Sequence, residues 1–167
     1  MEELDPDVVL QVAADAPDGV VIVDREGVIR YWNRGAERIF GHPASAMTGS
    51  SLDVIIPERL RQRHWEGFRA AMARGSTKYD DLLAVPAITA DGTTVSIEFS
   101  VVLLVDDDGG AHHIGAIIRD VTARRAAEQD MRRRLEGARR RRPAGLRAAG
   151  RTIRAPYVSV GFRGARP

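Results

Sequence analysis

"GVVIVDREGVIRYWNRGAERIFGH", residues 19–42, is the stretch that decides how this chain folds. Two short runs, 19–24 and 28–32, flank a tight turn that contains a glycine, and this pattern predicts a β-hairpin. The second run ends at Asn33, whose side-chain oxygen can accept one of the unpaired N–H groups at the start of a helix. The next residues, 34–40, then place apolar side chains on one helical face. The stretch therefore predicts two strands that lead directly into a capped helix.

The rest of the chain adds helices first and strands last. A regular alternation of apolar and polar residues over 95–103 predicts a strand, and Asp91-Gly92 before it is typical of a hairpin turn. Apolar side chains at four-residue steps predict a longer helix over 57–74. Less regular patterns complete the series: a short amphipathic helix over 6–16, helical turns and loops over 43–56, and strands over 80–88 and 114–119. This order predicts an antiparallel meander with helices on one face of the sheet.

The composition limits the class of protein. A length of 167 residues suits one domain plus an extension. The chain has no cysteine, which excludes disulfides, zinc–thiolate sites and a cysteine nucleophile. The start of the sequence lacks the pattern of a secretory signal, and no apolar run is long enough to span a bilayer. We therefore expect a soluble, cytoplasmic protein.

The net charge of +2 conceals an uneven distribution of charge along the chain. Residues 1–121 hold 11 Arg or Lys and 20 Asp or Glu, whereas residues 122–167 hold 14 Arg and 3 acidic residues. The basic character therefore belongs to the C-terminal part. It gives no reason to expect that the predicted sheet and helices bind nucleic acid.

The series of elements, with these residues, resembles a PAS domain. Three pieces carry the resemblance: "GVVIVDREGVIRYWNRGAERIFGH" (19–42), "DGTTVSIEFSVVLL" (91–104) and "IGAIIRDVTARR" (114–125). The resemblance implies an α+β PAS fold, with a five-stranded antiparallel sheet, short helices covering one face, and a C-terminal helix. It also implies a sensory or dimerisation module in signal transduction or transcription regulation, without catalytic activity. The expected divisions are a flanking helix (1–17), the PAS domain (18–121), a signalling helix (122–136) and a basic tail (137–167).

The resemblance also implies a small apolar cavity between the sheet and the helices, and an element that couples the last strand to the outgoing helix. Asp120 and Thr122 match the D-x-T element of the family, which would relay a change at the cavity. The alternative is that Asp120 is an ordinary acidic cap at a helix start. The residues predicted to line the cavity are Ile29, Leu60, His64, Phe68, Ile97, Phe99 and Ile114.

His64 is the candidate for a cofactor ligand. The segment "PERLRQRHWEGF" (57–68) resembles the helix that carries the proximal histidine in haem-binding PAS oxygen sensors, and a neutral imidazole can ligate haem iron. Those sensors hold oxygen with an arginine on the next strand, but here the equivalent region, 82–86, is apolar. The alternative is a histidine that is only part of the core. Haem is therefore an alternative prediction beside a PAS module that senses another ligand or a partner.

Other cofactors and metals have less support. Chromophores that need a cysteine are excluded, and non-covalent FAD, which Trp32 and Trp65 would line, is less favoured than haem. His112-His113 lies near three aspartates, 106–108, but these look like a solvated turn, so we predict no metal site. The sequence has no glycine-rich phosphate loop and no paired-carboxylate or nucleophile signature. We therefore predict that the chain is not an enzyme.

The C-terminal part carries the predictions about partners. Ala127, Met131 and Leu135 recur at four-residue steps in the predicted helix 122–136, which is too short to dimerise strongly alone. We expect a homodimer and a separate signalling output protein, or an output domain that has been lost. Residues 137–167 contain nine Arg and no acidic residue, and three readings stay open: a segment that binds nucleic acid or anionic lipid, a disordered tail, and an out-of-frame or truncated remnant.

Overall fold

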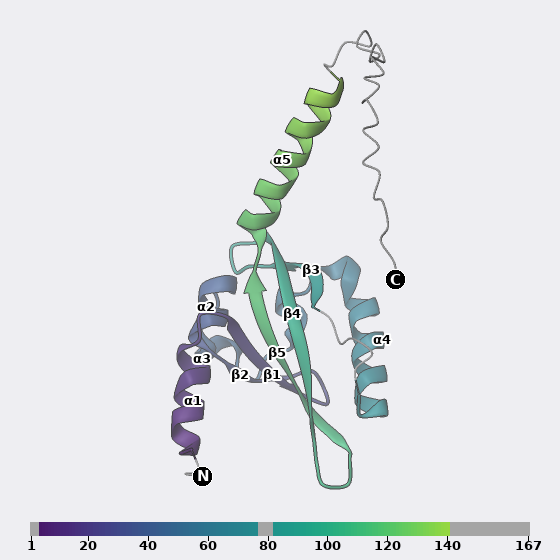
Figure 1. The fold of residues 1–167 in the computed structure, drawn as a ribbon. Helices are drawn as coiled ribbons and strands as arrows, with labels where there is room; N and C mark the ends of the chain where they lie inside the picture. Colours follow the sequence, from purple (N-terminus) through teal and green to yellow (C-terminus); the bar gives the residue numbers. More distant parts are fainter. Residues whose placement is uncertain (1–3, 77–81, 141–167) are drawn as a thin grey trace, which may run out of the picture. The chain divides into compact units, whose positions relative to one another are not determined.

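The computed structural model describes residues 4–76 and 82–140, and its elements follow the predicted order (Figure 1). The chain divides into two compact units, residues 1–129 and 130–167. The elements, with η1 a 3-10 helix, are α1 (Pro6–Asp15), β1 (Gly19–Asp24), β2 (Ile29–Trp32), α2 (Arg34–Phe40), α3 (Ala44–Met47), η1 (Leu52–Ile55), α4 (Glu58–Arg74), β3 (Leu83–Ile88), β4 (Thr94–Val105), β5 (Ala111–Asp120) and α5 (Thr122–Arg140).

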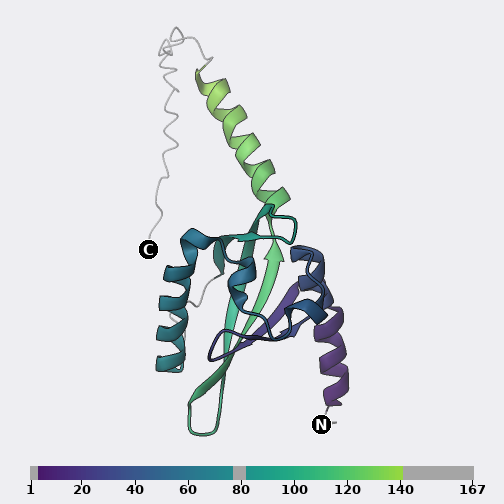
Figure 2. The same ribbon diagram turned by 180° about the vertical axis from the view of Figure 1, so that it is seen from behind.

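The strands form one five-stranded sheet in the order β2-β1-β5-β4-β3, and all neighbouring strands are antiparallel. The first strand and the last strand are therefore neighbours at the centre of the sheet, although about ninety residues separate them in the chain. The helices α2, α3, η1 and α4 cover one face of the sheet (Figure 2). This confirms the predicted α+β fold, including the antiparallel sheet and the C-terminal helix.

The core lies between this sheet face and the helices. Because side chains alternate between the two faces of a strand, the pairing of Val21 with Trp32 and of Phe99 with Ile118 places these four side chains on the same, covered face. Phe40 from α2 is fully buried in the same cluster. The alternating pattern seen in the sequence thus corresponds to one buried and one outward face.

Glycines and Asn33 set the ends of the helices. The Asn33 side-chain oxygen accepts a hydrogen bond from the Ala36 N–H and so caps α2. Gly41 (φ 74°) and Gly75 (φ 66°) end α2 and α4 in the left-handed conformation, which costs glycine little because it has no Cβ. These short-range signals explain why the bounds of α2 and the end of α4 agree closely with the sequence pattern.

The bounds of the later elements differ from the prediction. β4 and β5 extend beyond 95–103 and 114–119, because pairing of the two strands continues towards the hairpin, with Leu104 opposite His113 and Val105 opposite Ala111. β3 begins at Leu83, and residues 80–81 of the predicted strand lie outside the described residues. α5 runs to Arg140 instead of ending at residue 136, since arginine is a good helix former and the next proline is Pro143. The predicted tail therefore includes four helical residues, and the rest of it lies outside the described residues.

Candidate functional site

Six of the seven predicted cavity residues, all but His64, lie in or against one hydrophobic cluster. Ile29, Phe68, Ile97 and Ile114 are buried in it, and Leu60 and Phe99 are partly buried against it. They come from β2, α4, β4 and β5, so the fold brings together positions that are far apart in the sequence. The use of this cluster as a ligand cavity stays a prediction.

His64 lies on α4 within an aromatic group. Its ring centroid is 4.8 Å from that of Trp65 and 6.2 Å from that of Phe68. The Nε2 atom is buried and has no hydrogen-bond partner in the described part of the chain. Burial lowers the pKa of His64, while the nearby Asp53 carboxylate opposes this effect. The imidazole is thus held towards its neutral form, which is the form that binds metals.

The donor atom of His64 suits a haem ligand, but the space around it does not. Its ring is packed against Trp65 and Phe68, and the Trp65 Nε1–H donates to Asp53 Oδ1 over 2.7 Å. Over residues 4–76 and 82–140, His64 lines neither the open hollow at the end of α2 nor the one on α5. A haem at His64 would therefore need this aromatic packing to open.

A hollow lies elsewhere, between the end of α2 and the β3–β4 turn. It is an open groove of about 390 Å³, lined by Arg38, Ile39, Phe40, Gly41, Thr89, Ala90, Asp91 and Thr93. Hydrogen bonds from Thr89, and then from Thr93, lower the pKa of Asp91 to about 2. None of the predicted site residues lines this groove.

The two histidines near the β4–β5 hairpin form a close pair. The Nδ1 atoms of His112 and His113 are 2.5 Å apart. In the part of the chain that the structure describes, no group of three or more His, Cys, Asp or Glu residues is placed to hold a metal.

None of the helices within residues 4–76 and 82–140 combines the length and the apolar character that a membrane span needs.

The junction between β5 and α5 is fastened to β4. The Thr122 hydroxyl donates to Asp120 Oδ1 (2.6 Å) and accepts from the Ser96 N–H (2.9 Å). The Thr122 N–H also donates to Asp120 Oδ1 (2.8 Å), and the Val121 N–H donates to the Ser96 carbonyl over 2.9 Å. The two predicted coupling residues thus contact each other and the neighbouring strand.

A second contact across this junction was not predicted. Arg124, in the first turn of α5, forms an ion pair with Glu98 of β4. The alternation of apolar and polar residues over 95–103 places Glu98 on the polar face of its strand and gives no sign of this partner. Its pairing with a residue 26 positions later depends on the β4–β5 register, which aligns Glu98 with Arg119. A helix starting directly after β5 brings Arg124 within reach.

Asn33 is a buried polar residue that lies between the end of β2 and the start of α2. Only 3% of it is exposed. Its Oδ1 atom accepts from the N–H groups of Val20 (2.8 Å) and Ala36 (2.9 Å), and its Nδ2 group donates to the carbonyls of Ala13 (2.8 Å) and Asp18 (3.0 Å). The side chain therefore holds α1, β1 and α2 together, whereas the sequence predicted the cap of α2 alone.

Comparison with known proteins agrees with this architecture. A family model described as "PAS fold" matches residues 14–126. The chain is 27% identical to the sensor protein FixL of Bradyrhizobium diazoefficiens over 64% of this chain and 21% of that protein, and 23% identical to the oxygen sensor protein DosP of Escherichia coli over 68% and 14%. It thus spans less than a quarter of the length of these relatives.

A solved structure has the same arrangement of elements. The PAS domain of a protein from Colwellia psychrerythraea superimposes with a TM-score of 0.63 at 19% identity, covering 70% of this chain and 97% of that one. At this identity the likeness shows the fold alone. The family match, by contrast, extends over more than half of the chain and includes both the hairpin and the β5–α5 junction. The chain therefore belongs to the PAS-fold family.

Proposed function

We propose that the chain is a non-catalytic PAS sensory and dimerisation module of signal transduction or transcription regulation. It senses a small ligand or a partner at the hydrophobic cluster under α4 and relays the change through Asp120 and Thr122 into α5. The partners are a second copy and a separate output protein or an output domain. The family membership and the relatives named as sensors support this reading.

One observation carries the relay: the start of α5 is bonded to β4 as well as to β5. Ser96, which donates to Thr122, neighbours Ile97 in the hydrophobic cluster. A ligand that displaces the strand at Ile97 therefore changes the hydrogen bonds at the first residue of α5. Each of these exposed contacts is weak alone, so a small input of free energy is enough to shift their balance.

Native mass spectrometry of the purified chain tests the sensory and dimeric parts of the proposal together. We expect a dimer, a bound small molecule, or both. A chain that is monomeric and free of any ligand, and that shows no ligand-dependent thermal shift across a metabolite panel, would contradict the proposal. His64→Phe then shows whether a bound molecule depends on the imidazole, because this variant keeps an aromatic ring against Trp65 and Phe68 while removing the ring nitrogens.

Haem binding through His64 is a second candidate, favoured by the buried Nε2 atom, which has no hydrogen-bond partner among the described residues. If haem bound, His64 would hold its iron, and the haem would supply gas or redox sensing. The apolar residues of 82–86 offer no donor to a bound gas. An absorption spectrum of protein produced with haem available decides the matter. A Soret band that His64→Ala abolishes supports this candidate, and no band, or a band that this variant leaves unchanged, rejects it.

Nucleic-acid binding through residues 137–167 stays a prediction, because the residues beyond Arg140 lie outside those described. Shift assays with RNA and DNA over a range of salt concentrations test it, since binding through phosphate contacts weakens steeply as salt rises. The comparison is between the full chain and a chain that ends at residue 136. Equal binding by both would contradict a role for this segment.

A further inference from the structure

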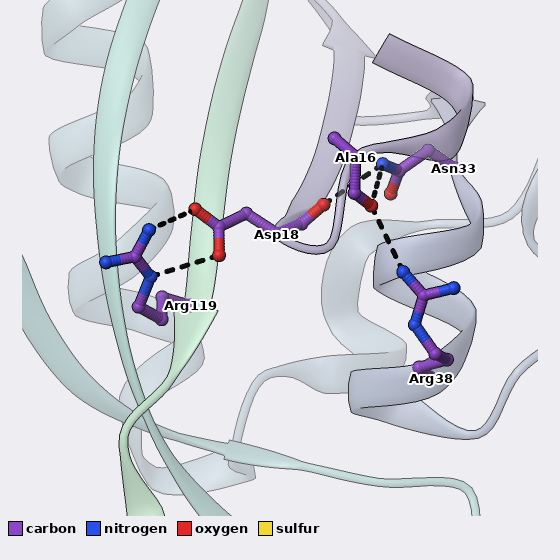
Figure 3. Close-up of polar contacts among 5 residues, drawn as sticks. All are labelled: Ala16, Asp18, Asn33, Arg38 and Arg119. Atoms are coloured by element: carbon purple, nitrogen blue, oxygen red, sulfur yellow. Dashed lines mark hydrogen bonds and ion pairs between the residues drawn. The ribbon is translucent and has the colours of Figure 1, made fainter. Parts of the chain in front are cut away.

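Three side chains hold the linker between α1 and β1: the N-cap residue of α2, an arginine of α2 and an arginine of β5 (Figure 3). Asn33, which precedes α2, donates to the Asp18 carbonyl over 3.0 Å, and Arg38 on α2 donates to the Ala16 carbonyl over 3.2 Å. Arg119 on β5 binds the Asp18 carboxylate. Figure 3 shows the Asp18 side chain turned towards Arg119 and its carbonyl turned towards Asn33.

The contact with β5 has the geometry of a strong ion pair. Arg119 donates from Nε to Asp18 Oδ1 over 3.0 Å and from a terminal nitrogen to Oδ2 over 2.6 Å. Such two-pronged pairing fixes direction as well as distance. The guanidinium of Arg119 lowers the pKa of Asp18, mainly through this hydrogen bonding. The pair joins residues 101 positions apart in the chain.

The linker has little room to move towards α2. A Cβ atom added to Gly35 would lie 2.1 Å from the Asp18 carbonyl oxygen and 2.8 Å from that of Ala16. The backbone of the linker therefore rests directly on the first turn of α2. Only a residue without a side chain permits this approach.

Helix α1 depends on these polar contacts because it buries no side chain of its own. Val8, Val9 and Val12 are 45%, 53% and 67% exposed, so apolar packing contributes little to its docking. Besides the linker contacts, the Asn33 amide donates to the Ala13 carbonyl, and an exposed ion pair joins Asp15 to Arg34. The position of α1 is thus set by hydrogen bonds and charges.

We infer that Asp18 and Arg119 form a clamp that couples the docking of α1 to the position of the end of β5. Arg119 directly precedes Asp120, the residue that bonds to the start of α5. A displacement of the end of β5 that changes the start of α5 therefore also changes the docking of α1, the first helix of the chain. The signalling meaning of the clamp rests on the proposed relay, but the mechanical coupling does not.

Hydrogen–deuterium exchange on the millisecond scale, measured on the full chain, tests the clamp. Asp18→Asn and Arg119→Gln should each raise exchange of the α1 amides about 1.5-fold to fivefold, the range expected for a partly exposed ion pair. Arg119→Lys keeps the charge but cannot form both hydrogen bonds to Asp18, so its α1 amides should exchange at a rate between those of the parent chain and Arg119→Gln. Asp130→Asn is the matched control: it breaks the exposed Asp130–Arg134 pair on α5 and should leave α1 unchanged.

Coupling has to work in both directions, and this separates the clamp from a merely local contact. Gly35→Ala displaces the linker from α2 without touching β5, and it should raise exchange at the amides of Arg119 and Asp120. Thermal unfolding of each variant identifies any global loss of structure. If Gly35→Ala does not fold, the charge-swapped pair Asp18→Arg with Arg119→Asp replaces it, and it should restore slow exchange in α1.

The outcomes distinguish the clamp from the relay. Amide exchange of α1 that is unchanged in both Asp18→Asn and Arg119→Gln would overturn the clamp. An effect of Gly35→Ala that is confined to the linker would also overturn it. So would a charge-swapped pair in which exchange of the α1 amides stays fast. None of these readouts needs a signal or an output protein. The relay stands or falls separately, on the exchange of the first turn of α5 when Thr122 is altered.

Discussion

At the residue scale, the β3–β4 turn shows how local hydrogen bonds set a titration. The Asp91 carboxylate accepts from the Thr89 hydroxyl (2.5 Å) and from the Thr93 N–H (3.0 Å), and these bonds hold its pKa at about 2, below the ordinary value of 3.8. The folded-state pKa is lowered, so the contribution of Asp91 to stability is present above pH 3.8. It is lost as the pH falls through about 2.

Removing the hydroxyl should reverse this shift. Thr89→Val is expected to raise the pKa of Asp91 towards 3.8, because the largest cause of the shift is the Thr89 hydrogen bond. Side-chain carboxyl chemical shifts followed by NMR between pH 1.5 and 6 measure the change. Thr94→Val, at the start of β4, is the control. An Asp91 pKa that remains near 2 in Thr89→Val would contradict the assignment.

Some single residues could be interpreted from sequence and others could not. The capping role of Asn33 follows from its neighbours in the chain, because a cap acts on the next turn of helix. The pairing of Asp18 with Arg119 has no local signal, since 101 positions separate the two residues. Only the adjacency of the first and last strands, which periodicity does not reveal, brings them together.

At the element scale, Trp65 of α4 packs directly on the β1–β2 turn. A Cβ atom at Gly27 would lie 2.2 Å from the Trp65 ring, and Gly27 has a φ of 77°. Both the space and the backbone conformation therefore require glycine. This contact fixes α4 against the hairpin, and with it the position of His64.

Gly27→Ala should reduce the free energy of unfolding by about 1–3 kcal/mol, the range for strain of a non-glycine residue at positive φ, and the clash with Trp65 adds to it. Gly67→Ala is the matched control, because Gly67 lies inside α4 with nothing within 4 Å of the added Cβ. It should increase stability by about 0.5–1 kcal/mol. Urea denaturation followed by Trp fluorescence measures both. Equal effects of the two substitutions would contradict the packing described for Trp65.

The sequence predicted the bounds of α2 and the end of α4 more closely than the bounds of β4, β5 and α5. Helices α2 and α4 end at glycines, and α2 begins at the Asn33 cap, which are signals carried by single residues. The strands β4 and β5 continue beyond the alternating pattern, because their length is set by pairing with each other rather than by their own side chains. The α5 boundary at residue 136 was wrong because a change in composition does not itself end a helix.

At the scale of the whole molecule, the proposed dimer has a specific test on α5. Met131 and Leu135 lie one turn apart on this helix and are 60% and 58% exposed. Replacing both by Gln should weaken dimerisation at least tenfold, since burying each such side chain is worth about 1.5–3 kcal/mol. Analytical ultracentrifugation measures the change, with Arg133→Gln as the control on the same helix. A monomeric parent chain, or equal dissociation constants for all variants, would contradict this interface.

The fold of the molecule could be predicted from the sequence, whereas its function could be predicted only in part. Local sequence patterns predict the order of hairpin, capped helix, further helices and meander, and the family resemblance adds the sheet topology. The candidate site depends instead on contacts between distant segments, such as Glu98 with Arg124, and on whether the core opens to a ligand. Neither property leaves a period or a motif in the sequence.

The central claim is that the start of β4 and the end of β5 together control the start of α5. Amide exchange in Thr122→Ala tests this claim most directly. Removing the Thr122 hydroxyl breaks its bonds to Ser96 and Asp120, so the amides of Ser96 and of the first turn of α5 should exchange faster together, by about fivefold to tenfold for each lost hydrogen bond. Ser76→Ala, in the segment after α4, should change neither region. Faster exchange at Ser96 with an unaltered α5 would contradict the account.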